Sequence, residues 1–232
     1  MHKHDLTDSI NEMLHMQSQL NVATNGENWR SGMTGLGKTI DWRRCIYMET
    51  AELIDSYPWK HWKSVEAPID EENVRIELVD IWHFILSLLL EKMAVEQASD
   101  LLLSVQNVSV EQIVDARDGL SVMDKVAVHE ALMACALQKG DVSEVYLRQL
   151  LESFLSSCKV AGLDFQQLYR LYMAKNVLNR FRQDHGYKEG TYTKLWNGRE
   201  DNVVMFEIIR EMTVFSGEEL YRNLKLSYAE ID

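Results

Sequence analysis

The chain has 232 residues, 46% of them apolar and 26% charged, a composition typical of a globular protein and not of a disordered one. Its formal net charge of −12 argues against binding to nucleic-acid polymers or anionic membranes, because both require clustered lysine and arginine. A small phosphorylated ligand stays possible, since a metal ion or a local basic patch can reverse the field at one site.

Three cysteines, Cys45, Cys135 and Cys158, lie far apart and form no CxxC pair. This spacing argues against a disulfide framework or a thiolate metal site and favours a reducing compartment. The first residues lack the apolar core of a signal peptide. The most apolar run, 81–90, is much shorter than the roughly 20 residues that span a bilayer. We therefore expect a cytoplasmic protein.

In the first half of the chain, apolar residues at helical spacing predict helices over 5–22, 41–57 and 70–92. Asp41 and Asp70 are suited to cap the second and third of these helices. The third is apolar on most sides, which is typical of a buried helix. The remaining segments are a glycine-rich loop at 24–39 and, after Pro58, a connector at 59–69 with two tryptophans.

The second half also has helical periodicity. Residues 94–140 are predicted to be helical with breaks at 107–109 and 118–121. Further helices are expected at 142–160 and 163–182, separated near Gly162, then a second glycine-rich loop at 184–202 and one broken or two short helices over 203–230. No alternating β-branched run stands out. The sequence therefore predicts an all-α fold, which we interpret as one domain over 1–232, a helical bundle with a rigid core and a more mobile helical part.

Two pairs of carboxylates occur on consecutive predicted helices, Glu49 with Glu52 and Glu77 with Asp80. Residues at i and i+3 share one helix face, so both pairs can converge on one small volume if the helices are neighbours. Four converging carboxylates repel one another, and a divalent cation would neutralise them. All-oxygen ligation favours hard ions, Mg²⁺ or Mn²⁺.

Spacing alone leaves two other interpretations open. The carboxylates could be solvated, or could pair with Arg43, Arg44 or Arg75. A helical di-iron site is the second alternative, because Glu12–His15 and Asp80–His83 have the Glu-x-x-His type of spacing. Neither carboxylate pair is followed by histidine in the required pattern, so we interpret His83 as a core histidine or a neighbour of the ligands.

A local reversal of charge follows near the end of the chain. Lys175, Asn179 and Arg182 lie on one face of a predicted helix, at i, i+4 and i+7. The loop that follows contains glycines, basic residues and aromatic residues: Tyr187, Lys188, Tyr192, Lys194, Trp196 and Arg199. Glycines let backbone N–H groups approach an anion, and lysine and arginine add charge-assisted hydrogen bonds. The segment is either a phosphate-binding lid or a solvated basic helix end followed by a flexible loop.

Two smaller patterns suit a nucleobase. Gln17 and Asn21 lie at i and i+4, and side-chain amides offer both donors and acceptors, as the edge of a base does. Trp59 and Trp62 could stack on a base. In each case a plain role, as surface amides or as tryptophans that fill a core, remains an alternative.

Together these segments resemble the dimeric all-α dUTPases of trypanosomatids and Campylobacter-like bacteria, which belong to the all-α nucleoside triphosphate pyrophosphatases. The strings that carry the resemblance are QSQLN (17–21), TNGENW (24–29), WRRCIYMETAELIDS (42–56), WKHWK (59–63), ENVRIELVDIWHF (72–84) and KNVLNRFRQDHGYKEGTYTKLWNGREDN (175–202). They cover about half of the chain. The helical segment 93–160 matches no motif of the family.

The resemblance implies hydrolysis of dUTP and dUDP to dUMP with Mg²⁺, two or three ions per site and Mn²⁺ as a substitute, in a homodimer. It implies Glu49, Glu52, Glu77 and Asp80 as metal ligands, with Glu49 also activating the attacking water. It implies Gln17 and Asn21 as the uracil-reading amides, Trp62 in preference to Trp59 as the stacking ring, and His83 and Asn202 as deoxyribose contacts. The phosphate contacts would be Lys175, Asn179, Arg182, Tyr187, Lys188 and Lys194. Two alternatives are an enzyme of the same superfamily that prefers another deoxynucleotide, such as dCTP, and a binding protein without activity.

Overall fold

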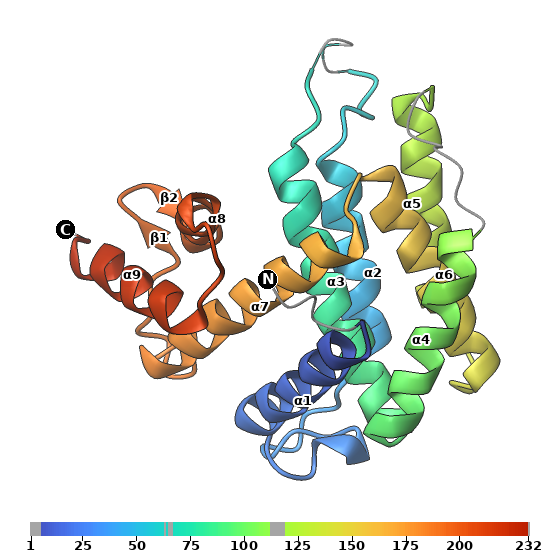
Figure 1. Ribbon diagram of the computed structural model, residues 1–232, viewed down its shortest axis with the longest axis horizontal. Helices are drawn as coiled ribbons and strands as arrows, with labels where there is room; N and C mark the ends of the chain where they lie inside the picture. Colours follow the sequence, from blue (N-terminus) through green and yellow to red (C-terminus); the bar gives the residue numbers. More distant parts are fainter. Residues whose placement is uncertain (1–5, 63, 65–66, 112–118, 232) are drawn as a thin grey trace. The chain divides into compact units, whose positions relative to one another are not determined.

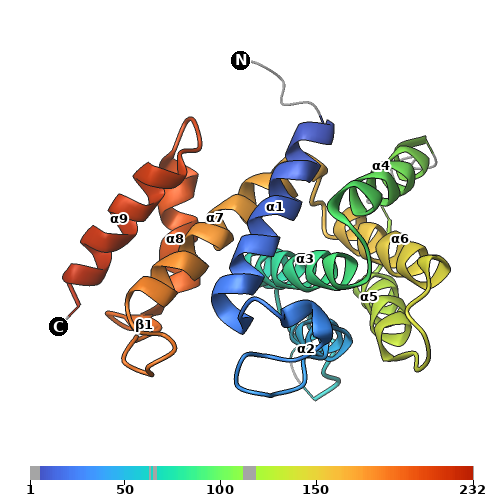
Figure 2. The same ribbon diagram turned by 90° about the horizontal axis from the view of Figure 1, so that it is seen from below.

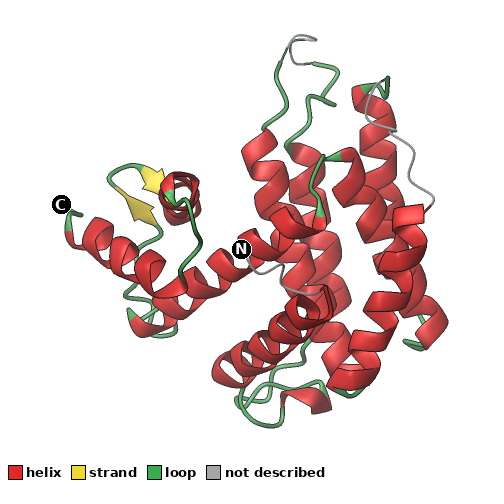
Figure 3. Cartoon of the chain, in the orientation of Figure 1, coloured by secondary structure: helices red, strands yellow, loops and turns green. Residues whose placement is uncertain are grey.

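The computed structural model describes residues 6–62, 64, 67–111 and 119–231. Helices dominate these residues, and a two-stranded hairpin is the small exception (Figure 3). The chain forms two compact units, Met1–Phe165 and Gln166–Asp232. The prediction of an all-α fold is therefore confirmed. No helix in the described ranges is both long and apolar enough to cross a membrane.

The first unit is a bundle in which α2 and α3 lie side by side, with α5 against α2 and α6 against α5 (Figures 1 and 2). Its elements are α1 (Leu6–Asn25), the short 3₁₀ helix η1 (Trp29–Ser31), α2 (Trp42–Asp55), α3 (Glu71–Lys92), α4 (Val95–Glu111), α5 (Val122–Leu137) and α6 (Glu144–Val160). The pairing of α2 with α3 decides where the site forms, because the two carboxylate pairs lie on these helices.

The predicted starts of α2 and α3 are confirmed. Asp41 accepts a hydrogen bond of 3.0 Å from the backbone N–H of Arg44, and Asp70 accepts one of 3.0 Å from that of Asn73. Both are N-cap bonds, which satisfy backbone donors that have no partner within the helix. The apolar surface of α3 is buried on most sides, as its composition indicated.

One predicted break is wrong. Residues 107–109 do not interrupt the chain, because α4 continues to Glu111. Asn and Ser lower helix stability by only a few tenths of a kcal/mol each, which the buried contacts of Leu101, Leu102 and Val105 on the same helix offset. Of the predicted break at 118–121, position 118 lies outside the described residues. From Gly119 to Ser121 the chain is not helical, and Ser121 forms a capping box at the start of α5.

The second unit comprises α7 (Phe165–Asp184), β1 (Leu195–Trp196), β2 (Arg199–Glu200), α8 (Asp201–Glu211) and α9 (Gly217–Ala229). The strands correct the expectation of a structureless loop to residue 202, since β1 and β2 pair antiparallel and α8 already begins at Asp201. Asn197 and Gly198 form the turn with positive φ angles of 50° and 81°, which asparagine and glycine tolerate. Of the two arrangements expected for the last segment, one broken helix or two short helices, the structure has two helices.

An aromatic cluster forms the core of this unit. Phe181 and Trp196 are buried, and Tyr192 stacks on Tyr228 with ring centroids 5.3 Å apart and an interplanar angle of 10°. These four residues belong to α7, the glycine loop, β1 and α9. The glycine loop, residues 185–194, is therefore packed against α9 at Tyr192, whereas Tyr187 and the two lysines are exposed.

Candidate active site

The carboxylates of α2 and α3 converge, as the i, i+3 spacing predicted. Oxygen atoms of Glu49, Glu52 and Glu77 all lie within 4.8 Å of one another. Asp80 is not among the carboxylates that meet at this distance, although its charge still acts on Glu77. The structure thus brings three of the four predicted ligands together and leaves the fourth beside them.

Glu77 has the most unusual environment of this group. Its residue surface is 6% exposed, and its side chain shares a hydrogen bond with Glu49. Burial, followed by the charges of Asp80, Glu49 and Glu52, raises the pKa of Glu77 to about 9. At neutral pH the Glu77 carboxyl is therefore protonated. A cation bound there would relieve the same repulsion between the carboxylates.

The donor set fits a hard divalent cation. Within the part of the chain that the structure describes, the group of converging side chains contains carboxylates and no histidine or cysteine. His83 is not a member of this group, and its Nδ1 lies 2.7 Å from Oε1 of Gln17. Oxygen ligands alone suit Mg²⁺ or Mn²⁺ better than zinc or iron.

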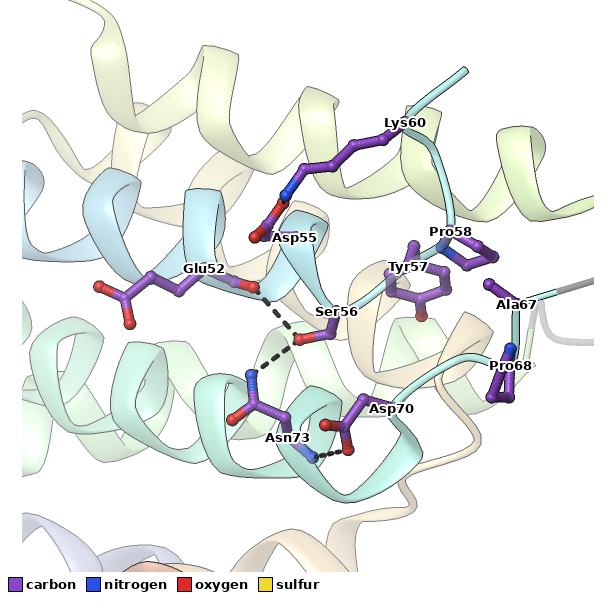
Figure 4. A pocket seen from close by; sticks show the side chains of 10 residues that line it. All are labelled: Glu52, Asp55, Ser56, Tyr57, Pro58, Lys60, Ala67, Pro68, Asp70 and Asn73. Atoms are coloured by element: carbon purple, nitrogen blue, oxygen red, sulfur yellow. Dashed lines mark hydrogen bonds and ion pairs between the residues drawn. The ribbon is translucent and has the colours of Figure 1, made fainter. Parts of the chain in front are cut away.

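A pocket of about 390 Å³ adjoins Glu52 at the end of α2 and the start of α3 (Figure 4). Its wall is held by Asn73, which donates a hydrogen bond of 2.8 Å to Ser56, and by the ion pair between Lys60 and Asp55. The first contact links the end of α2 to α3, and the second links α2 to the connector. Sequence reasoning missed this pocket, because it depends on how the end of α2 meets the start of α3.

Gln17 and Asn21 lie in a buried network with two residues of α3. The Nε2 of Gln17 and the Nδ2 of Asn21 donate hydrogen bonds of 3.0 and 3.1 Å to the hydroxyl of Ser87. Ser87 in turn donates to the carbonyl of His83 at 2.8 Å. We call these four residues the amide network. The structure confirms that both amides share a face, but they are buried and not on the surface, and Ser87 was missed.

The two tryptophans of the connector differ in how firmly they are held. Their rings meet edge to face with centroids 6.0 Å apart. Trp59 is 38% exposed, and its Nε1 donates a hydrogen bond of 3.3 Å to Asp55. Trp62 is 65% exposed. The more exposed ring of Trp62 has the larger face available for stacking.

In the second unit the structure brings together four residues that the sequence singled out, and we call them the polar strip: Lys175, Asn179, Arg182 and Asn202. Lys175 and Arg182 both donate to Oδ1 of Asn202, at 2.9 and 3.3 Å, and Arg182 reaches Asn179 at 3.4 Å. Sequence reasoning missed Asp201, which forms a two-bond ion pair with Arg182.

The other predicted phosphate contacts differ from the polar strip in their exposure. Tyr187, Lys188 and Lys194 are exposed on the glycine loop. The ammonium of Lys194 lies 5.7 Å from the centre of the Tyr187 ring, a cation–π distance. The predicted phosphate residues therefore form two sets with two positive charges each: one is buried or half-buried and hydrogen-bonded (Lys175, Asn179 and Arg182), and the other is exposed (Tyr187, Lys188 and Lys194).

A family model described as dUTPase matches residues 9–187. The chain belongs to the dUTPase family. It is an enzyme, a dUTP diphosphatase, and its helical fold agrees with the all-α members that the sequence resembles. The matched range includes the carboxylates, the amide network and α7, and it ends at Tyr187, before Lys188, Lys194 and Asn202. No curated protein matches the chain.

Proposed function

We propose that this dUTPase hydrolyses dUTP and dUDP to dUMP with Mg²⁺ bound by Glu49, Glu52, Glu77 and Asp80. The observation that carries the proposal is the convergence of three carboxylates within 4.8 Å around a nearly buried Glu77. Of the three, Glu77 is buried, Glu49 is half-buried and Glu52 is exposed, so ionising the buried Glu77 beside the other two is costly unless a cation or a proton offsets its charge.

Bound there, the ion would supply charge neutralisation for the phosphates and lower the pKa of a water molecule. Glu49 is half-buried and hydrogen-bonded to Glu77, so its orientation is restricted. It is therefore the side chain that we assign to orient the attacking water and accept its proton. The polar strip, with Lys188 and Lys194, would hold the negative charge of the phosphate chain.

The amide network is our candidate for the base pocket. Its buried donors and acceptors, from Gln17, Asn21 and Ser87, can recognise the edge of uracil by hydrogen bonding, with His83 towards the deoxyribose. Trp62, which the resemblance implies as the stacking ring, precedes the start of α3, whereas Ser87 lies roughly 24 Å along that helix, so the fold does not bring this ring to the network. A buried polar site discriminates well, because a wrong base leaves its groups without hydrogen bonds. A preference for dCTP is the alternative, since the same amides could reorient to present the opposite pattern.

The test is a hydrolysis assay with dUTP, dUDP and dCTP, each with Mg²⁺, with Mn²⁺ and with EDTA. We expect turnover of dUTP and dUDP that EDTA abolishes and either metal restores. Turnover of dUTP that persists in EDTA would contradict the metal site, whereas faster turnover of dCTP would contradict the uracil pocket. No release of phosphate or pyrophosphate from any deoxynucleotide would favour a binding protein that has lost its activity.

We also propose a homodimer, as the family resemblance implies, and a cytoplasmic location, as the cysteine pattern indicates. The three cysteines support a reducing compartment, because they are free and two of them are buried. Sedimentation at several protein concentrations measures the oligomeric state, and a monomer at all of them would exclude the dimer. Fractionation of the producing cells tests the location.

A further inference from the structure

Asp201 is the first residue of α8 and is fully buried, with 0% of its surface exposed. Its two carboxylate oxygens accept hydrogen bonds of 2.8 Å each from Nε and Nη2 of Arg182. One of them also accepts a hydrogen bond of 2.6 Å from the hydroxyl of Tyr192. Burial alone would raise the pKa of Asp201, but the bonds from Arg182 outweigh it and lower this pKa. The carboxylate is therefore ionised at neutral pH.

These bonds connect three segments that are separate in the sequence. Arg182 lies near the end of α7, Tyr192 in the middle of the glycine loop, and Asp201 at the start of α8. The backbone adds a fourth bond, from the N–H of Asp201 to the carbonyl of Lys194 at 2.9 Å. A side chain that fixes α7, the loop and α8 at one point limits the conformations available to each.

The same contacts fix the orientation of the polar strip. Two donors of the Arg182 guanidinium are directed to Asp201, so the plane of the group is set, and its Nη1 then faces Asn179. Asn202 follows Asp201 in the chain and receives the bond from Lys175. Without the ion pair Arg182 could rotate, and Asn179 and Asn202 would then lose the hydrogen bonds that it donates to them.

We propose that Asp201 is a positioning residue, which holds Arg182 and, through Tyr192, the glycine loop in the arrangement that binds the phosphate chain. Asp201 itself touches no substrate in this role. The inference rests on the proposed function, in which the polar strip and the loop lysines contact the phosphates. A carboxylate near a phosphate site repels it unless its charge is neutralised, and the two-bond pair with Arg182 provides that neutralisation.

The test compares Asp201→Asn, Tyr192→Phe and Lys175→Met with the wild-type enzyme at a temperature at which all are folded by circular dichroism. Asp201→Asn keeps the size of the side chain but cannot accept two bonds from Arg182. We expect its KM for dUTP to rise at least about 10-fold, the loss that corresponds to one or two charge-assisted hydrogen bonds, while kcat changes less. Trypsin should cleave at Lys188, Lys194 or Arg199 faster than in the wild type, because the loop is released.

Lys175→Met separates this inference from the proposed function. If it raises KM while a folded Asp201→Asn leaves KM and loop cleavage unchanged, the positioning role is wrong and the phosphate site stands. If neither variant changes KM, both are wrong. Should Asp201→Asn fail to fold, Tyr192→Phe decides the question, since it removes only the hydroxyl and keeps the ring stacked on Tyr228. Faster loop cleavage and a raised KM in this variant support the inference, and wild-type values of both overturn it.

Discussion

The side chains of Glu49 and Glu77 share a hydrogen bond between α2 and α3, although both are acids. This is possible because burial and three neighbouring carboxylates raise the pKa of Glu77 to about 9, so that it keeps its proton at neutral pH. In the unfolded chain the same group ionises near its ordinary value of 4.5. Between these two values the folded state binds more protons than the unfolded state, and the contribution of Glu77 to the free energy of unfolding falls as pH rises.

The first prediction concerns stability without metal. In the wild-type enzyme the free energy of unfolding should decrease between pH 5 and pH 8.5, by up to about 1.4 kcal/mol per pH unit for one proton. Glu77→Gln should make this decrease smaller. Urea denaturation in EDTA at several pH values measures it, and Mg²⁺ should stabilise the wild-type enzyme most at high pH. Parallel pH profiles of the two proteins would show that Glu77 does not titrate as described.

The second prediction concerns Glu49. Replacing it by Gln keeps the size and hydrogen-bonding capacity of the side chain but removes its ability to accept a proton. We expect kcat for dUTP to fall at least about 100-fold, typical of the loss of a general base, with a nearly unchanged melting temperature. Glu96→Gln, at an exposed acid of α4, is the matched control and should behave as the wild type. Normal turnover by Glu49→Gln would exclude the role that we assign to it.

The third prediction concerns base selectivity. Ser87→Ala removes the hydroxyl that accepts from both amides of the network, so Gln17 and Asn21 lose a fixed orientation. We expect kcat/KM for dUTP to fall by about 10-fold relative to that for dCTP, as in other sites where a hydrogen bond is lost. Ser99→Ala, at a buried serine of α4 outside the network, controls for the loss of a hydroxyl. An unchanged ratio of the two substrates would separate the network from base recognition.

The fourth prediction concerns the glycine loop. Gly186 has a φ of +87°, and a Cβ at this position would overlap the hydroxyl of Thr191. Gly190 has a φ of +73° but open space around it. Gly190→Ala should therefore cost only the backbone strain, about 1 kcal/mol, whereas Gly186→Ala should cost about 1–3 kcal/mol more. Thermal unfolding of both variants measures the difference, and equal stabilities would indicate that Thr191 moves aside without cost.

Features that depend on neighbouring residues of one helix could be predicted from the sequence. The caps at Asp41 and Asp70 and the shared face of Glu49 and Glu52 follow from the geometry of a single helix turn. Convergence with Glu77 could be predicted as well, because a short connector makes consecutive helices neighbours.

Features that depend on contacts between residues far apart in the sequence could not be predicted. In the sequence Ser87 only interrupts an apolar run, and its role depends on the contact with Gln17 of α1. Asp201 is likewise only an acid at the start of a helix, and its role depends on the contact with Arg182 of α7. The hairpin at 195–200 has a local signal, Asn197–Gly198, but each strand is too short to show alternation. The absence of a break in α4 reflects tertiary packing that outweighs weak local preferences.

The stacking of Tyr192 on Tyr228 limits how the end of this enzyme can vary. The loop and the hairpin are attached to α9 and its C-cap residue by three contacts: the ring stack, a bond from the N–H of Thr193 to the hydroxyl of Tyr228, and a bond from the amide of Asn197 to the carbonyl of Glu230. An insertion or deletion between α8 and α9 would shift all three attachments together. We therefore expect homologues to preserve the length of this short connection more strictly than its residues, and to change the two tyrosines only as a pair.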